Sequence, residues 1–542
     1  MGLNLDLIIF LVYIGIVLMT GILVSRKSKK SGDDYFLAGR NLTWWVIGGS
    51  LIAANISTHH FIGMSGQGFS IGLAIASFEW MAAIALIIYG KFFLPYYLKT
   101  KITTMPEFLE RRFNHQVRLS FAIISLVGYI FIELAVVLYT GALALESIFG
   151  LPLYYGLVIL FVVTGAYTIY GGLKSVVYTD IIQVFVLICG GLLVTFIGLA
   201  AVGKHSPEYS DSIFGGFKAI LEGAPEKFRM VKAWDHPEVP WVGVFFGGVM
   251  LANVFYWGCN QFITQRTLAA RSVWHGQMGV VFAGFLKLLV PVLVVLPGII
   301  CFFLYNAENG LMNSEYVLTK ADLAFPTLVK NMLPTGLSGL VMAGLLGAVM
   351  STIASLLTSS SSILVYDLYK ARINPDVSPK IMVRIGRLTM LVILIIATIF
   401  GYFLRDLSGI FIYIQKYWSI AYPSIVAVFL GGFFYKRATS RGSLLAIIIG
   451  TSWAIMINVA ELAEWIPLVP FLNRVIIDFL ICAFIIWIFR QKSGPIKEKA
   501  IIDRSLSEEA RAQIEMVPWY GKFELWSIIL LLILAFLYIR FF

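Results

Sequence analysis

The feature that most restricts the fold of this sequence is a succession of apolar segments, each about as long as a bilayer is thick. A helix needs about 20 mostly apolar residues to cross the hydrocarbon core of a membrane. Segments of this kind fill most of the 542 residues. They predict fourteen membrane-spanning helices, near residues 5–25, 44–71, 76–97, 119–148, 152–171, 178–203, 241–264, 276–305, 336–366, 382–403, 408–434, 442–460, 467–489 and 523–541.

Composition supports a membrane protein and excludes several other classes. Hydrophobic residues make up 59% of the chain and charged residues 13%, whereas a soluble domain is nearer half apolar and a quarter charged. Spanning β-strands show alternating runs of about ten residues, and the runs here are longer and uniformly apolar. We therefore expect an all-α integral membrane protein of the cell membrane, plasma or bacterial inner. A soluble enzyme, a disordered chain and a secreted disulfide scaffold are excluded.

The motifs that the sequence lacks narrow the source of energy. It contains neither a G-x-x-x-x-G-K-[ST] phosphate loop nor an H-E-x-x-H metal motif. Its four cysteines lie in apolar runs without metal-ligand spacing, so we expect free, buried thiols. A polytopic chain without an ATPase is most simply a channel or an ion-coupled carrier. We expect neither enzymatic activity nor an organic cofactor.

Basic residues set the expected orientation. Arg26 and three lysines follow the first apolar segment and none precedes it, which is the reverse of a secretory signal and places residue 1 outside. With this topology the inner segments, among them 266–275 with Arg266, hold 29 of the 41 Lys and Arg, in agreement with the positive-inside rule. The net charge of +11 therefore reflects inner loops and does not indicate a nucleic-acid partner.

Two apolar segments contain polar runs that predict broken helices. The second segment holds Asn55, Ser57, Thr58, His59 and His60 among glycines. Such breaks free backbone carbonyls to hold a cation near the midplane of the bilayer. Residues 251–260 form a second candidate break, five spans later. Two breaks in matching positions predict an inverted repeat, which would place the repeats in helices 2–6 and 7–11.

Five of the charged residues within the predicted spans are of particular interest. A charge at bilayer depth costs about 2.5–3.5 kcal/mol on insertion scales, so each of them needs a partner or a function. They are Glu79, Glu133, Asp180, Lys287 and Lys416.

Several longer motifs resemble the sodium:solute symporter family, and within it the bacterial sodium/galactose and the sodium/glucose cotransporters. They are Ser50–Ser57, Phe61–Gly66, Ile71–Ser77, Glu79-Trp80, Gly171–Leu173, Thr179–Gln183, Gln265–Ala270, Phe285–Leu288 and Asp367–Lys370. The resemblance implies a leucine-transporter-like core of two inverted five-helix repeats, with one helix before it and three after. The implied division is an extra helix in 1–30, a first repeat in 31–203, an extracellular loop 204–240, a second repeat in 241–435, and peripheral helices in 436–542 with a cytoplasmic loop 490–522.

The resemblance also implies two binding sites. The family's sodium site uses carbonyls and hydroxyls, which here would come from Ala53, Ile56, Ala348, Ser351 and Thr352. The sugar pocket would take Asn55, His60, Glu79, Asn253, Tyr256, Lys287 and Gln415. Tyr256 fits the family's inner-gate tyrosine, Met64, Phe78 and Trp257 are further candidate platforms, and His59 is expected to point away from the cavity. Asp180 matches an acid that the family links to cation coupling.

Each of these assignments has a purely structural alternative. Glu79 and Lys287 can form an ion pair without a ligand, and His60 can be a satisfied interior imidazole. Ser351 and Thr352 can bond to carbonyls of their own helix. Asp180 can cap or pair near the cytoplasmic end of its helix. Ser355 is a candidate for a second sodium site.

The function implied is sodium-driven symport of a glucose- or galactose-type hexose by alternating access. The partners implied are sodium, the sugar and the lipid bilayer, and no obligate protein partner is evident. The bacterial galactose carriers have Asn where Glu133 stands and Gln where His60 stands, so the substrate can differ from galactose. Alternatives are a sodium symporter for another polyol such as an inositol, one for an organic acid, and a sugar-gated sensor or channel on the same scaffold.

Overall fold

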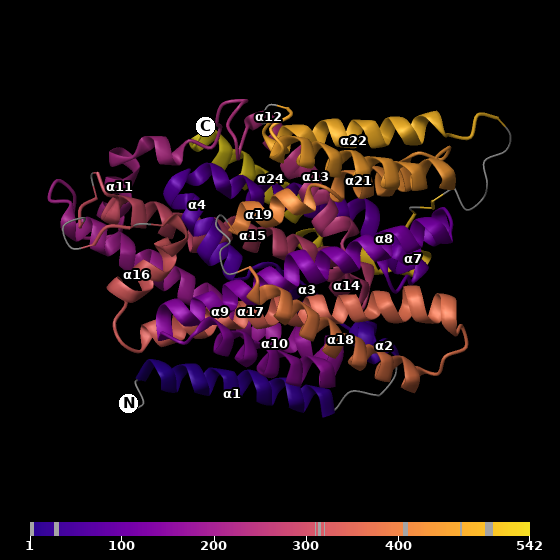
Figure 1. Cartoon of the computed structure of the whole chain (residues 1–542), viewed down its shortest axis with the longest axis horizontal. Coiled ribbons are helices and arrows are strands. Elements are labelled where there is room, and N and C mark those ends of the chain that lie inside the picture. Colours follow the sequence, from indigo (N-terminus) through magenta and orange to yellow (C-terminus); the bar gives the residue numbers. More distant parts are fainter. Residues whose placement is uncertain are drawn as a thin grey trace.

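In the computed structural model most of the long helices run roughly along one direction (Figure 1). Within the parts of the chain that it describes, the only β-type pairings are two isolated bridges, Leu42–Ala270 and Lys232–Pro240. The all-helical prediction is confirmed. The structure describes residues 5–26, 32–308, 310–312, 316–318, 320–404, 410–466, 469–493, 502–503 and 505–542.

Eleven helical stretches in these residues are long and apolar enough to cross a membrane. Two further helices, α19 (Ile410–Trp418) and α20 (Tyr422–Phe434), are bent by 49° at the short break between them, and they make a twelfth stretch if the pair counts as one span. The stretches are Leu5–Val24, Leu73–Thr100, His115–Glu146, Leu153–His205, Trp241–Cys259, Val273–Tyr305, Leu337–Ile373, Pro379–Tyr402, Ser440–Glu461, Phe471–Ile488 and Phe523–Arg540.

The longer helices follow the predicted segments. They are α1 (Leu5–Arg26), α3 (Trp44–Asn55), α5 (Ser77–Ile88), α8 (His115–Val127), α9 (Ala135–Phe149), α10 (Leu153–His205), α15 (Val273–Tyr305), α17 (Leu337–Ser362), α18 (Pro379–Tyr402), α19 (Ile410–Trp418), α20 (Tyr422–Phe434), α21 (Ser440–Leu462), α22 (Phe471–Ile488) and α24 (Phe523–Arg540).

Shorter elements connect these helices or extend them. They are α2 (Gly32–Leu37), η1 (Ala38–Arg40), η2 (His59–Met64), α4 (Ser65–Ser70), η3 (Leu73–Ala76), η4 (Tyr89–Phe93), α6 (Leu94–Thr100), α7 (Met105–Arg112), η5 (Gly128–Leu134), α11 (Ile213–Gly223), η6 (Pro225–Phe228), α12 (Trp241–Phe245), α13 (Gly248–Val254), η7 (Phe255–Cys259), α14 (Gln261–Leu268), η8 (Ala321–Leu323), α16 (Ala324–Met332), η9 (Ile363–Ile373), α23 (Glu508–Glu515) and η11 (Trp519–Gly521).

The two predicted breaks are present. After α3 the backbone of Ile56 is extended, with φ −79° and ψ 122°, before the chain re-enters helix at η2 and α4. After η7 the backbone of Asn260 is extended in the same way, with φ −84° and ψ 120°, before α14 begins. The breaks divide the second predicted span and the segment 241–264, and they leave backbone polar groups free at the centre of the molecule.

A third break lies in α10, where two predicted spans join. Gly172 has φ 62° and ψ −161°, which are not helical angles. A straight helix of 53 residues would be about 80 Å long at 1.5 Å per residue, far more than the roughly 30 Å hydrocarbon core. A Cβ at Gly172 would lie 2.5 Å from the carbonyl oxygen of Tyr35, so glycine is required both for the turn and for the contact.

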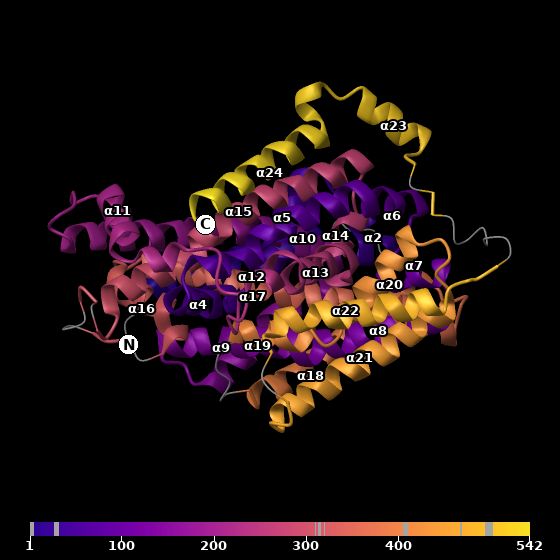
Figure 2. The ribbon, with the colours of Figure 1, turned by 90° about the horizontal axis from the view of Figure 1, so that it is seen from above.

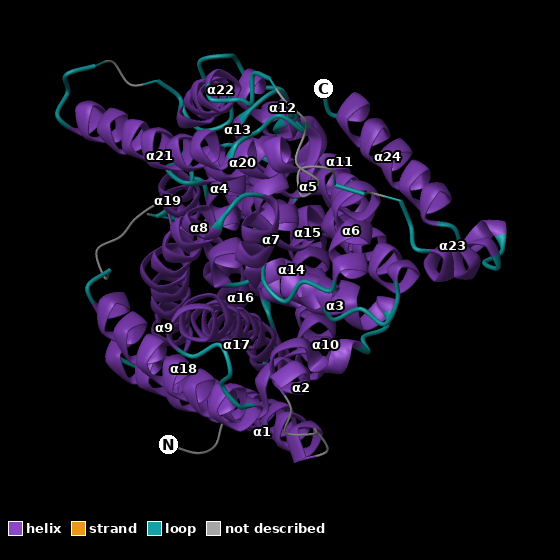
Figure 3. Cartoon of the chain, turned by 90° about the vertical axis from the view of Figure 1, so that its right-hand side faces the viewer, coloured by secondary structure: helices purple, strands orange, loops and turns teal. Residues whose placement is uncertain are grey.

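The first broken helix, which consists of α3 and α4, lies at the centre of the bundle. Viewed end-on, α1 and α18 lie at one edge, α21 and α22 at a second and α24 at a third, while α3, α14 and α15 lie between them (Figure 3). Only 28% of the spanning window of α1 and 22% of that of α24 are buried, compared with 94% for the stretch that begins with α17. The view from above shows α24 along one side and α23 beyond it (Figure 2). The peripheral helices are therefore largely exposed, and the buried central helices form the site.

Two glycines allow α4, the second half of the broken helix that begins with α3, to touch α15 through backbone atoms. A Cβ on Gly298 would lie 1.9 Å from the carbonyl oxygen of Ser65, and one on Gly68 would lie 2.4 Å from that of Val295. Both approaches are closer than any real Cβ contact. The position of α4 therefore depends on small residues at this crossing, as is common where membrane helices pack.

Gly298→Ala should lower the stability of the purified protein in detergent by about 1–3 kcal/mol, because the added methyl group forces α4 and α15 apart. Thermal unfolding measures the effect. Gly15→Ala in α1 is the matched control, since a Cβ there meets nothing within 4 Å. Equal unfolding temperatures for the two variants would contradict the close packing of α4 on α15.

Candidate functional site

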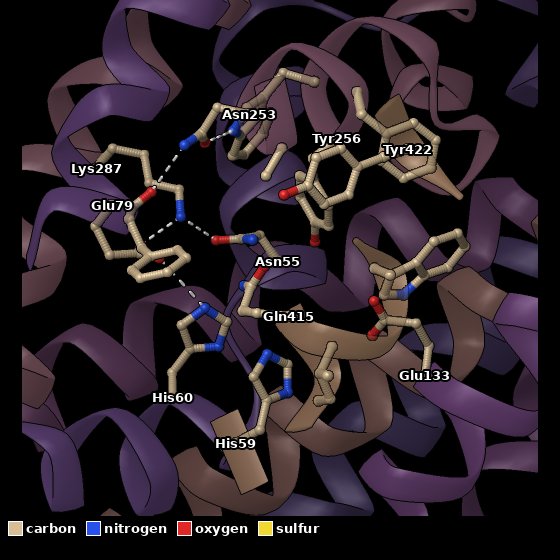
Figure 4. A pocket seen from close by; sticks show the side chains of 16 residues that line it. Asn55, His59, His60, Glu79, Glu133, Asn253, Tyr256, Lys287, Gln415 and Tyr422 are labelled. Carbon is tan, nitrogen blue, oxygen red and sulfur yellow. Dashed lines mark hydrogen bonds and ion pairs between the residues drawn. The ribbon is translucent and has the colours of Figure 1, made fainter. Parts of the chain in front are cut away.

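A pocket lies between the two breaks, and it is lined by every residue of the predicted sugar set. It holds a cavity of about 70 Å³ that is accessible to water-sized molecules. Side chains from both halves of the chain point into it (Figure 4). Its lining consists of Asn55, His59, His60, Phe78, Glu79, Glu133, Ala252, Asn253, Phe255, Tyr256, Trp257, Lys287, Ile414, Gln415, Trp418 and Tyr422.

Lys287 joins three elements at one end of the pocket. Its Nζ donates hydrogen bonds to Glu79 Oε2 on α5 and to Asn55 Oδ1 at the end of α3 (Figure 4). The ammonium also lies 5.3 Å from the ring centroid of Trp257, and His60 Nε2 lies 3.4 Å from Glu79 Oε1. Lys287 and Glu79 are 1% and 3% exposed, so each charge depends on the other for compensation.

Asn253 makes its hydrogen bonds to neighbouring residues of the pocket wall. Its Nδ2 donates to the carbonyl oxygens of Phe78, at 3.2 Å, and Val249, at 3.0 Å, and its Oδ1 accepts from Trp257 Nε1 at 3.2 Å. Both of its N–H donors are thus used, and the oxygen keeps one acceptor position. In this arrangement Asn253 orients Trp257 and offers little more than that oxygen to a ligand.

Two histidines lie at the restart of the broken helix, and the expectation for His59 was wrong. His59 lines the pocket with His60, and the ring centroids are 4.2 Å apart. The chain leaves the helix at Ile56 and restarts in a wide turn, so consecutive side chains do not diverge as they would on a regular helix. Ser57 Oγ pairs with His59 Nδ1 and fixes its ring.

Of the predicted platforms, Phe78, Tyr256 and Trp257 line the pocket, while Met64 is fully buried and is not among the lining residues. The Tyr256 and Trp257 rings meet edge to face at 5.2 Å. In Figure 4 the Tyr256 hydroxyl lies over Asn55 and Gln415. The pocket thus offers flat apolar faces beside hydrogen-bonding groups.

The break releases the carbonyls that the sequence assigned to a cation. In a continuous helix the N–H groups of Ser57 and His60 would bond to the carbonyls of Ala53 and Ile56. Here Ser57 N–H donates to His60 Nδ1, and His60 N–H donates to Ser57 O. The carbonyls of Ala53 and Ile56 are therefore freed beside α17.

Thr352 on α17 reaches the first half of the broken helix. Its Oγ1 lies 2.9 Å from the carbonyl oxygen of Ala54 and 3.0 Å from that of Ala348. The second contact is the helix-internal bond of the structural alternative, and the first crosses to α3. Carbonyl and hydroxyl oxygens thus meet at one point between the two helices, and oxygen ligands suit a hard cation.

Asp180 lies next to this point in a fully buried network. One carboxylate oxygen accepts from Ser351 Oγ at 2.6 Å, and the other accepts from Ser50 Oγ and from Arg266 Nη2, the latter at 3.2 Å. Arg266 also donates to Ser50 through Nε and to Ser355 Oγ. The guanidinium therefore links α3, α10, α14 and α17.

The position of Arg266 corrects the sequence prediction, which placed it in an inner loop. Both Arg266 and Asp180 have no exposed surface, so Asp180 is not an end cap. The chain returns to helix after Asn260 and carries Arg266 back into the bundle as part of α14. Ser355, the candidate for a second sodium site, is bonded to this guanidinium and to the carbonyl of Ser351.

Comparison with known proteins gives a consistent result. The sodium:solute symporter family matches residues 35–450. A sodium/glucose cotransporter of Vibrio parahaemolyticus is 42% identical over 495 residues, which cover 89% of this chain and 89% of that protein. The sodium/glucose cotransporter 4 of Mus musculus is 32% identical over 488 residues, covering 85% of this chain and 70% of that protein.

A solved structure supports the fold. The substrate-bound outward-open state of a Na⁺-coupled sialic acid symporter superposes with a TM-score of 0.79 at 22% identity, over 91% of this chain and 99% of that one. This likeness establishes the fold alone, which is that of the leucine-transporter-like carriers. The chain is a multi-pass membrane protein, and it belongs to the sodium:solute symporter family.

Proposed function

We propose that the chain is a sodium-coupled sugar symporter that works by alternating access and holds its substrate in the central pocket. The observation that carries this proposal is the convergence of seven polar residues from both halves of the chain on one pocket, beside the carbonyls freed at Ala53 and Ile56. The pocket binds the sugar and the neighbouring oxygens bind sodium. Occupation of both sites drives one transport cycle.

The pocket matches the chemistry of a sugar. Each hydroxyl of a hexose both donates and accepts a hydrogen bond. Glu79 accepts, Lys287 donates, and Asn55, Gln415 and His60 supply both kinds of group, while the free oxygen of Asn253 adds one acceptor. Tyr256 and Trp257 offer apolar faces to the C–H side of the ring. Tyr256 closes the inner side and moves when the sugar leaves.

The breaks support a topology of fourteen crossings. The eleven long stretches become fourteen crossings when α10 counts twice, at Gly172, and when the broken pairs α3–α4 and α19–α20 count once each. Residues 31–203 and 241–435 then form two inverted repeats, each with a break in its first span. The basic inner segments place the N-terminus outside.

Sodium binds between the two halves of the broken helix and α17, with Ala53, Ile56, Ala348, Ser351 and Thr352 as its oxygen ligands. Asp180 accepts the Ser351 proton, which leaves the lone pairs of that hydroxyl for the ion. Asp180 is therefore a positioning residue for coupling. Sodium fixes α3 against α17 and so favours the state that receives sugar from outside.

Thr352→Val should raise the sodium concentration for half-maximal uptake by about tenfold, since it removes one oxygen ligand and keeps the shape. Sugar uptake over a range of sodium concentrations measures this change. Thr358→Val is the matched control, because the Thr358 hydroxyl bonds only to Ala354 and Ser355 of its own helix. An equal sodium requirement in both variants would exclude Thr352 as a ligand.

The charged residues of the pocket argue against an organic acid as the substrate. An organic acid would meet two carboxylates, Glu79 and Glu133, and only one ammonium, Lys287. A neutral polyol such as an inositol fits the same groups as a hexose and remains an alternative substrate for the uptake test to examine. A sugar-gated sensor or channel would bind sugar and pass current without concentrating the sugar.

The test is uptake of labelled glucose and galactose by proteoliposomes, with and without an inward sodium gradient. A potential of about 100 mV and a tenfold sodium gradient supply about 3.7 kcal/mol, which supports about 500-fold accumulation for one sodium per sugar. We expect sodium-dependent accumulation above the outside concentration. Current without accumulation would favour a channel. If neither sugar is taken up, a hexose is excluded as the substrate and a polyol such as an inositol remains.

A further inference from the structure

The central pocket contains a second carboxylate that the proposed function does not use. Glu133 lies on η5, is 6% exposed and lines the pocket on the wall across from Lys287 (Figure 4). Among the residues that the structure describes, no lysine, arginine or histidine forms an ion pair with Glu133. The ammonium of Lys287 is already bonded to Glu79 and Asn55.

Among the described residues that line the pocket, the ionised form of Glu133 therefore has no positive partner. A carboxylate at this depth is costly unless it is compensated, and a neutral sugar compensates nothing. A ligand that brings a positive charge to Glu133 would complete the balance, as Lys287 does for Glu79 at the other end.

The surroundings of Glu133 identify the kind of cation. Phe255, Trp418 and Tyr422 also line the pocket, and in Figure 4 Tyr422 lies on the same side of it as Glu133. The ring of Phe255 lies 5.2 Å from that of Trp418 and 6.2 Å from that of Tyr422. A metal ion would need several oxygen ligands, which aromatic rings do not provide. A carboxylate beside aromatic faces is instead the chemistry that holds an organic ammonium group.

We propose that the pocket accepts a sugar or polyol that bears a protonated amino group, with this ammonium bound to Glu133 between the aromatic rings. The hydroxyls of the same molecule reach Glu79, Lys287 and Asn55 at the opposite end. This inference rests on the proposed function and names a substrate class for its site. Glu133 determines specificity within that class.

The experiment compares paired competitors of labelled glucose uptake by proteoliposomes under an inward sodium gradient. Glucosamine and its isomers with the amine at other ring carbons are each paired with the neutral deoxyglucose that lacks that amine. At a pH where the amines are protonated, at least one of them should inhibit at a concentration about tenfold lower than its neutral partner, because a charge-assisted hydrogen bond replaces a neutral contact.

Glu133→Gln should abolish this preference, read as the ratio of the two inhibitory concentrations within each variant. Glu226→Gln is the control for general surface charge, since Glu226 is an exposed carboxylate of the outer loop, and it should keep the wild-type ratio. Ratios near one for every wild-type pair would overturn the inference, and so would a tenfold ratio that survives Glu133→Gln.

The outcomes separate this inference from the proposed function. Sodium-dependent glucose uptake without any preference for amines leaves the symporter standing and removes the inference. If glucose is not taken up, uptake of labelled glucosamine is measured directly. Sodium-dependent glucosamine uptake that Glu133→Gln abolishes supports the inference and excludes plain glucose, while failure of both substrates overturns both proposals.

Discussion

Lys287→Met should reduce sodium-driven sugar accumulation in proteoliposomes by at least about a hundredfold. The ammonium makes charge-assisted bonds to Glu79 and Asn55, and it is the principal cationic donor that the pocket offers to a sugar hydroxyl. A hydrogen bond from a charged group to a sugar hydroxyl contributes about 1.5–3 kcal/mol, and loss of the ammonium also frees Glu79 and Asn55 from the positions in which they face the sugar, so binding should fall by about a hundredfold or more. Initial uptake rates at saturating sodium measure the loss.

A second variant separates loss of the site from loss of the fold. Lys287→Met alone leaves the buried Glu79 carboxylate without the ammonium that compensates its charge, which costs about 3–5 kcal/mol. The double variant Lys287→Met with Glu79→Gln removes both charges and should regain most of the unfolding temperature in detergent. It should still fail to accumulate sugar. Transport by the double variant would show that the pair is a structural one, as the alternative from the sequence has it.

The fold was predictable from the sequence because each of its signals is local. Apolar runs of bilayer length gave the helices, and polar residues among glycines located the break at Ile56. The breaks also explain why length and hydropathy alone find eleven or twelve spans: α3 and α4 are each too short to be counted, and the two halves of α10 stay joined at Gly172.

The pocket was predictable only through family resemblance, and its details were not predictable at all. Seven residues from separate helices line one cavity, and no local pattern relates Asn55 to Gln415. The orientation of His59 depends on the wide turn after the break. Arg266 follows the predicted span 241–264, as a loop residue would, and only the restart of helix after Asn260 brings it into the core.

Arg266→Met should both destabilise the protein and abolish sodium-dependent uptake. Its guanidinium bonds to Asp180, Ser50 and Ser355, and neither member of the ion pair has any exposed surface. Removing one partner of a buried pair costs about 3–5 kcal/mol, a large fraction of the 5–15 kcal/mol by which proteins are stable. The yield of monodisperse protein and its unfolding temperature in detergent measure this cost.

Two further variants test whether the pair also positions the sodium ligands. Arg266→Lys keeps the charge but cannot reproduce the planar fork that links α3, α10 and α17, so it should fold and still require more sodium than the wild type. Arg266→Met with Asp180→Asn removes both charges and should recover stability. It also changes the acceptor that holds the Ser351 proton, so its sodium requirement should rise by about tenfold. A stable double variant with the wild-type sodium requirement would reduce the pair to a structural bond between helices, and Thr352, Ala53 and Ile56 would then set sodium affinity without Asp180.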